Sequence, residues 1–184
     1  RAERVRGARV TSEFFRLLGV RAASGRLFDQ NADRTDGSHV AVISHAMWRE
    51  YFAGDPHIVG RTIRLNNEMY EVIGVLAEAF QFTLLGRVHV WRPFVFTPES
   101  STDRRNLALV GLGRLQPGAT AEHARDELTR IAADLAASHP DTNAKRSVRV
   151  LPLADAGATW WIESNWSTWG TKPQRARIDA GPPR

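Results

Sequence analysis

The stretch GDPHIVGRTIRLNNEMYEVIGV, residues 54–75, decides the fold of this chain. Its first residues end a helix, because Gly54 readily takes the left-handed backbone conformation and Asp55-Pro56 does not continue a helix. The stretch therefore places a helix before residue 54 and a turn after it.

The remainder of the same stretch has the pattern of a β-hairpin. Residues 62–65 alternate between polar and apolar side chains, and residues 70–75 are rich in β-branched ones. Between them, Asn66-Asn67 tolerates the positive φ angles of a tight hairpin turn. These features predict structure and point to no activity.

The N-terminal part of the chain predicts a strand followed by a short helix. The strand covers residues 8–10, and Thr11 or Ser12 caps the helix, which Gly19 ends. Two adjacent aromatic residues in this helix, at positions 14 and 15, are assigned to the core.

A second strand and helix lead up to the hairpin. The strand covers residues 39–43, and Ser44 caps the helix that follows. Its apolar side chains form i,i+4 pairs, so we assign them to the core as well. The pairs are Met47 with Tyr51 and Trp48 with Phe52.

The second half of the chain begins after a loop at residues 97–103. Residues 107–115 alternate as a strand, Thr120 caps a helix over residues 121–138, and residues 147–153 form a last strand. The helix carries one apolar stripe at helical spacing, and His139-Pro140 ends it. The stripe consists of Ala124, Leu128, Ile131, Ala132 and Leu135.

The composition bounds the class of protein. With 184 residues and 42% hydrophobic residues, the chain is long enough to bury a core. Its net charge of +5 comes almost entirely from scattered arginines, since Lys145 and Lys172 are the only lysines. Without a basic run we predict no nucleic-acid partner. Cysteine is absent and no apolar run approaches the roughly 18 residues of a membrane span.

The motifs of common enzyme classes are missing. The sequence has no phosphate-binding loop, dinucleotide fingerprint, Gly-x-Ser-x-Gly elbow or His-Glu-x-x-His motif, and no acid–base pair stands out. We therefore assign no catalytic, cofactor-binding or metal-binding residue and predict that the chain is not an enzyme.

A calcium loop is the nearest approach to a metal site. Asp29, Asn31 and Asp33 stand at alternate positions, as the first ligands of an EF-hand do. However, Arg34 occupies the sixth position, where the loop needs glycine, and Val40 occupies the twelfth, where it needs glutamate. We interpret this segment as a surface loop.

The chain changes character after Leu153. Four of the six tryptophans fall within residues 160–169, among polar residues without periodicity. Such a segment suits an aromatic platform for a carbohydrate, an anchor at a membrane interface, or a disordered tail. We predict that residues 154–184 are an atypical, disordered tail, and a shifted reading frame or a truncated gene would account for it.

Residues 54–75 resemble a segment of the periplasmic core domain of MacB-like ABC-transporter permeases, in which a helix ends at GDPxxVGxxIxLNxxxYxVIGV. Further segments resemble the same family in the same order, so that the resemblance runs from about residue 5 to residue 153. They are VTSEFFRLLGV at 10–20, GRLF at 25–28, VAVIS at 40–44, VWRPF at 90–94, GRLQPGAT at 113–120 and HPDT at 139–142.

The resemblance implies an α+β fold with two subdomains. A porter-like subdomain of βα units comprises residues 1–34 and 103–153, and a smaller, mainly β, sabre-like subdomain comprises residues 35–102. The family's first strand–helix unit is missing here, and the membrane helices expected on both sides lie outside this sequence. In the family a transmembrane helix follows the last strand, and residues 154–184 depart from that pattern.

The resemblance also implies a function. Such domains lie on the periplasmic side of the bacterial inner membrane and pass ATP-driven motion of the transmembrane helices outward, which helps to export a substrate. The implied partners are the permease's transmembrane helices, a second permease copy, a separate ATPase subunit, and an adaptor or lipoprotein. The alternative is an extracytoplasmic carbohydrate- or peptide-binding module that uses the tryptophan-rich tail.

Overall fold

The predicted hairpin is present in the structure, a computed structural model that describes residues 2–33, 39–98, 102–104, 109–154 and 174–179. Strands β4 (Thr62–Leu65) and β5 (Glu68–Leu76) pair antiparallel. Asn66 and Asn67 form the turn between them with φ angles of 51° and 70°. This is the backbone conformation that the Asn-Asn dipeptide predicts.

Strand β5 also holds the rest of the sheet together. Its second half pairs parallel with β3 (Val40–Ile43) and antiparallel with β2 (Ala22–Gly25). Strand β3 then pairs with β6 (Val90–Pro93), and β6 pairs parallel with β1 (Ala2–Val10). The combination of helices with a mixed sheet confirms the predicted α+β class.

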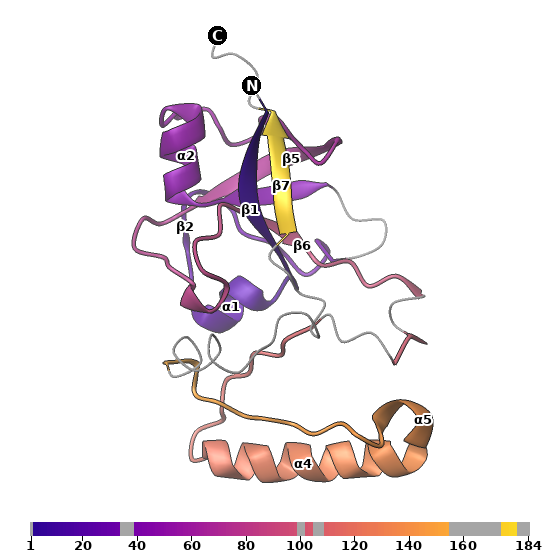
Figure 1. Ribbon diagram of the computed structural model, residues 1–184. Coiled ribbons are helices and arrows are strands. Elements are labelled where there is room, and N and C mark those ends of the chain that lie inside the picture. Colours follow the sequence, from indigo (N-terminus) through magenta and orange to yellow (C-terminus); the bar gives the residue numbers. More distant parts are fainter. Residues whose placement is uncertain (1, 34–38, 99–101, 105–108, 155–173, 180–184) are drawn as a thin grey trace. The chain divides into compact units, whose positions relative to one another are not determined.

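A seventh strand closes part of this sheet into a ring. Strand β7 (Gln174–Asp179) pairs antiparallel with β1 and also with β4. Since β4 pairs with β5 as well, the strands β5, β3, β6, β1, β7 and β4 form a continuous hydrogen-bonded cycle, and β2 is attached to β5 outside it. Figure 1 shows β7 alongside β1.

This strand differs from the tail that the sequence predicts. The tail prediction covered residues 154–184, and Gln174–Asp179 form regular structure instead. The tryptophans at positions 160–169 lie outside the described residues.

One face of the sheet packs against helix α2 (His45–Phe52). The oxygen of Ser44 caps this helix, accepting a hydrogen bond from the Met47 amide at 3.1 Å, as predicted. Met47 is fully buried, and Trp48, Tyr51 and Phe52 pack around the same cluster. The strands contribute apolar side chains to it, among them Val5, Ala41, Ile43, Ile63, Leu65, Val72, Val75 and Val90.

The opposite face carries an aromatic cluster centred on Trp91. Successive residues of a strand point to opposite faces, so Val90 joins the α2 side and Trp91 the other. Helix α1 (Phe14–Leu18) supplies Phe14 and Phe15, whose ring centroids lie 5.2 and 5.7 Å from that of Trp91. Both phenylalanines are buried, which confirms their assignment to the core.

The cap of α1 differs from the sequence prediction. Gly19 ends the helix with φ 70°, as expected, but the N-cap residue is Glu13, with no side-chain cap. Ser12 does not cap the helix because its amide and hydroxyl both donate to the carboxylate of Asp33, at 3.2 and 2.9 Å.

The chain forms two compact units. One comprises Arg1–Pro98 with Thr171–Arg184, and the other comprises Glu99–Gly170, so the division falls within the loop predicted at residues 97–103. The first unit contains strands from both segments 1–34 and 35–102, which share one sheet. The porter-like and sabre-like division stays a prediction.

The second unit contains helix α4 (Ala121–Ser138) and the short helix α5 (Pro140–Asn143). Helix α4 has the predicted bounds, with the Thr120 hydroxyl accepting from the His123 amide at 3.1 Å and His139 ending the helix. The strands predicted at 107–115 and 147–153 are wrong where they are described, because residues 109–115 and 147–152 form no strand. A strand requires a partner to pair with, and the described residues of this unit provide none.

Two glycines allow β2 and β5 to approach closely, and this makes a testable prediction. Gly25 lies opposite Gly74, and a Cβ on Gly74 would lie 2.2 Å from the backbone oxygen of Arg26. We expect Gly74→Ala to lower the free energy of unfolding by about 1–3 kcal/mol, the usual cost of overpacking. Chemical denaturation of the two proteins measures the difference.

The matched control is Gly111→Ala. A Cβ at Gly111 would meet nothing within 4 Å. This variant should therefore unfold within about 0.5 kcal/mol of the parent chain. Equal stability of both variants would contradict the close approach of β2 and β5.

Candidate interaction surface

The turn at the start of the stretch 54–75 is held by hydrogen bonds to both the carboxylate and the backbone of Asp55. One carboxylate oxygen of Asp55 accepts from the His57 amide at 2.8 Å, and the other pairs with Arg61 at 2.6 Å. The indole N–H of Trp48, on α2, donates to the carbonyl oxygen of Asp55 at 2.8 Å. The hydrogen bond from the His57 amide, followed by that from Arg61, lowers the pKa of Asp55.

These contacts give the Asp55 carboxylate a structural role. Gly60 and Arg61 continue the turn onto β5: the Gly60 amide donates to the Val72 carbonyl, and the Val72 amide donates to the Arg61 carbonyl, each at 2.8 Å. The turn thus fastens the end of α2 to the hairpin. The carboxylate already accepts two hydrogen bonds, so nothing here marks it as a catalytic group.

A second polar cluster joins β5 to β6 through the buried side chains of Tyr70 and Arg92. The Tyr70 hydroxyl donates to the Glu68 carboxylate at 2.6 Å and accepts from the Arg92 guanidinium at 2.9 Å. Arg92 is a buried cation that also lies over the Tyr70 ring, and the His39 ring stacks on the same tyrosine. Burial, then the hydrogen bond to Glu68, raises the pKa of Tyr70. The cluster stabilises the interior of the sheet.

The calcium-like loop holds its carboxylates in local contacts. Asp29 accepts from the Asn31 amide at 3.0 Å and pairs with Arg26 at 3.2 Å, and Asp33 accepts from Ser12 as described above. Within the described part of the chain, no three histidine, aspartate or glutamate side chains are grouped as metal ligands would be. Arg34 lies outside the described residues.

The surface that stands out lies in the second unit. None of the residues described between positions 102 and 154 is buried, so this part of the chain has no core of its own. The unit carries seven of the ten large hydrophobic residues that are exposed in the described chain. They are Leu109, Val110, Leu115, Leu128, Ile131, Val148 and Leu153.

Helix α4 places part of this apolar surface on a regular face. The predicted stripe is present, with Leu128 41% and Ile131 39% exposed. The polar part of the helix has the short-range contacts of a solvated surface, including an ion pair between Arg130 and Asp134 at 3.2 Å. We refer to the stripe of Ala124, Leu128, Ile131, Ala132 and Leu135 as the α4 apolar face.

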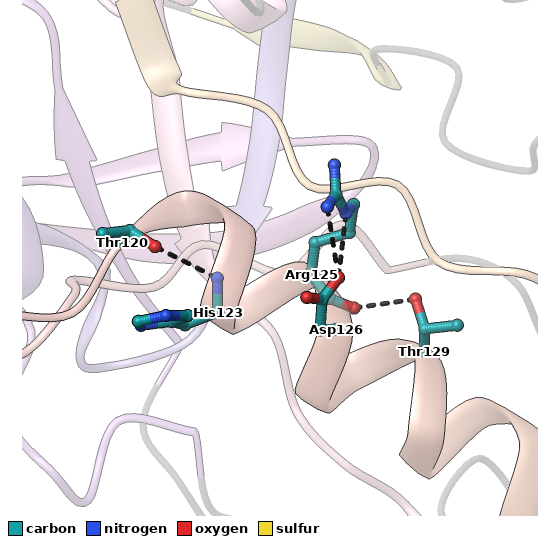
Figure 2. Close-up of polar contacts among 5 residues, drawn as sticks. All are labelled: Thr120, His123, Arg125, Asp126 and Thr129. Atoms are coloured by element: carbon teal, nitrogen blue, oxygen red, sulfur yellow. Dashed lines mark hydrogen bonds and ion pairs between the residues drawn. The ribbon is translucent and has the colours of Figure 1, made fainter.

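The first turns of α4 are polar, and their polar groups form hydrogen bonds and ion pairs within the helix. Figure 2 shows the Thr120 cap, the ion pair between Arg125 and Asp126 at 3.2 Å, and the Thr129 hydroxyl, which donates to the Arg125 carbonyl at 2.7 Å. His123 contributes its backbone amide to the cap. These contacts order the helix, and they form no group of converging ligands or nucleophiles.

Exposed apolar area of this kind indicates an interaction surface. A folded segment recovers the free energy cost of ordering its backbone mainly by burying apolar side chains, and this unit buries none of its described ones. Contiguous apolar surface on a folded protein commonly marks a contact with another polypeptide or a membrane. The sequence predicted the stripe but not its exposure, because spacing alone does not reveal what covers a helix.

The fold and this surface describe a mixed α+β domain with exposed apolar side chains in its second unit. Comparison with families makes this specific, since the MacB-like periplasmic core domain matches residues 1–131. The chain belongs to this family, whose members are periplasmic domains of ABC-transporter permeases rather than members of an enzyme family.

A solved structure supports the fold. The chain is similar to the crystal structure of the periplasmic region of MacB from Actinobacillus actinomycetemcomitans, with a TM-score of 0.53 and 14% identity. The match covers 89% of this chain and 74% of that one. Comparison with curated proteins gives no match. None of the helices in the described residues is long and apolar enough to span a membrane.

The Tyr70 cluster makes a prediction with an internal control. Tyr70→Phe removes one hydrogen-bond acceptor of the buried Arg92 guanidinium, so we expect the free energy of unfolding to fall by about 1–3 kcal/mol. The control is Tyr51→Phe, the other tyrosine of the chain, which lies on α2 and is partly buried against the core cluster. Thermal or chemical denaturation should show a clear loss for the first variant and little for the second. The reverse order would contradict the role of the Tyr70 hydroxyl.

The exposure of the α4 apolar face leads to a further prediction about stability. Ile131→Ala should change the stability of the 184-residue chain by less than about 0.5 kcal/mol, as at other surface positions. Ile43→Ala, the same change at a residue with 0% exposure, should cost about 2–5 kcal/mol. A large loss at Ile131 would mean that the chain itself covers this face.

Proposed function

We propose that this chain is the non-catalytic periplasmic domain of an ABC-transporter permease that couples ATP-driven motion of the transmembrane helices to export of a substrate. The observation that carries the proposal is the match of the MacB-like periplasmic core domain over residues 1–131. In this role the domain works on the periplasmic side of the bacterial inner membrane, and it transmits motion rather than catalysing a reaction.

The first unit has the physical properties that such a role requires. A body transmits a displacement when it moves without deforming, and close-packed interiors resist deformation. Here the sheet is packed on both faces, by α2 on one and by the aromatic cluster around Trp91 on the other. The strand cycle adds continuous hydrogen bonding around six strands.

The proposed partners follow from the same role. They are the permease's transmembrane helices, a second permease copy, a separate ATPase subunit, and an adaptor or lipoprotein on the periplasmic side. The α4 apolar face supports the presence of a polypeptide partner, since two of its large side chains, Leu128 and Ile131, are exposed in the chain. The alternative of a carbohydrate- or peptide-binding module depended on the tail tryptophans, which lie outside the described residues, and no observation favours it.

Spin-label distances in the full permease test this proposal. The chain contains no cysteine, so single and double cysteines introduced into it are labelled without background from this domain. Glu78 and Arg64 are both exposed residues of the first unit. One sample carries Glu78→Cys in each permease copy, and a second carries both Glu78→Cys and Arg64→Cys in the same copy. The full permease is reconstituted with its ATPase in lipid nanodiscs.

We expect the distance between the two copies to change between the ATP-bound and ADP-bound states. The distance between the two labels within one copy should stay constant, because the unit moves as a rigid body. An ATPase that cannot hydrolyse ATP serves as the control and should arrest the change. Two outcomes would argue against transmission by this domain. One is a distance between copies that is the same in the ATP-bound and ADP-bound states, and the other is a distance within one copy that changes between them.

A further inference from the structure

His89 joins three elements of the first unit at one point. It lies between the 3-10 helix η1 (Thr83–Leu85) and β6. Its backbone amide donates to the Arg6 carbonyl on β1, and its carbonyl accepts from the Ser44 amide at the cap of α2, each at 2.8 Å. The ring meets that of Tyr51 edge to face, with centroids 6.3 Å apart.

The side chain of His89 adds a contact that depends on its protonation. Its Nδ1 atom accepts a hydrogen bond from the Arg6 backbone amide at 3.3 Å. Only a neutral imidazole offers a ring nitrogen as an acceptor, because both nitrogens of the protonated ring carry hydrogen. A protonated His89 would therefore direct an N–H group at the N–H group of Arg6.

The charged groups around the ring are mainly cationic. From β1, Arg6 reaches the Leu85 carbonyl with its guanidinium at 3.2 Å. From the same segment as His89, Arg87 pairs with Glu50 of α2. From α2, the titratable side chain next to the His89 ring is Tyr51, whose ring it meets edge to face. Burial, then the negative charge of Glu3 on β1, raises the pKa of Tyr51.

These surroundings favour the neutral ring. Burial, then the positive charges of Arg87 and Arg6, lower the pKa of His89, and Glu50 opposes them only in part. At neutral pH the ring therefore offers Nδ1 as an acceptor, and the hydrogen bond from the Arg6 amide is present.

We propose that His89 is a pH-sensitive latch that holds β1 to the segment before β6 while its ring is neutral and releases it on protonation. The latch lies at the start of the parallel pairing between β1 and β6, in which Gly7 is opposite Val90. Releasing the Arg6 amide would loosen the first rung of that pairing. This inference goes beyond the proposed function and does not depend on it, although the pH of a periplasmic domain's surroundings varies with the environment of the cell.

The direction of the effect follows from proton linkage. A histidine whose pKa is lower in the folded than in the unfolded chain binds fewer protons when folded. Its contribution to stability is fully present above the unfolded pKa of about 6.5 and is lost as the pH falls through the folded pKa. Acidification should therefore open the latch first and lower the stability of the unit with it.

Amide hydrogen exchange of the full 184-residue chain tests the latch. An NMR titration of the His89 ring first gives the midpoint of its protonation. Protection factors, corrected for the intrinsic pH dependence of exchange, are then measured for the amides of Arg6 and Val72 at one pH above and one pH below that midpoint. We expect Arg6 to lose protection at the lower pH while Val72, whose partner is the Arg61 carbonyl, keeps it. An NMR titration of the His89 ring should follow the same curve as the Arg6 amide.

Two variants separate the latch from other effects of acid. His89→Asn places a non-titrating acceptor near the position of Nδ1, so its Arg6 amide should stay protected at both pH values. His123→Asn removes an exposed histidine of α4 and should retain the wild-type response. If His89→Asn does not fold, the comparison of His89 protonation with Arg6 amide protection in the wild-type chain tests the latch by itself. An Arg6 amide that stays protected below the midpoint, where the His89 ring is protonated, would overturn the proposal.

Discussion

The pairing of strand β5 with three other strands is the interaction on which the first unit depends. Its nine residues pair with β4 near the start, with β3 in the middle and with β2 at the end. At the β2 end, Gly74 lies opposite Gly25, where neither residue has a side chain to hold the strands apart. The close approach at one end and the Asn-Asn turn at the other fix the register of β5, and both apolar clusters are built on that register.

The turn at the start of the stretch 54–75, before the hairpin, explains why this domain is recognisable from its sequence. Gly54, Asp55 and Gly60 each serve the backbone: two take positive φ angles, and the third ties the turn to Arg61 and to the His57 amide. Few other residue types can replace them, because each is required by a local backbone conformation or hydrogen bond rather than by the volume of its side chain. The stretch therefore identifies a fold, and it carries no information about a transported substrate.

How far the sequence predicts the structure depends on how local each interaction is. The hairpin turn, the Ser44 and Thr120 caps and the bounds of α4 were predictable because each depends on residues within four positions. Strands β1, β6 and β7 depend on partners far along the chain, so the ring was not predicted. The strands expected at 107–115 and 147–153 had suitable side chains but found no partner among the described residues, and residue pattern alone does not reveal whether a partner exists.

The pairing of β1 with β7 has a mechanical consequence. Ala2 lies opposite Asp179, so both ends of the described chain leave the ring at the same edge. A force that separates these two ends would unzip the antiparallel pairs one after another, starting from that edge. A force that carries both ends in the same direction loads the whole ladder together. The first unit is therefore compliant to a pull between its ends and stiff to a displacement that its ends share.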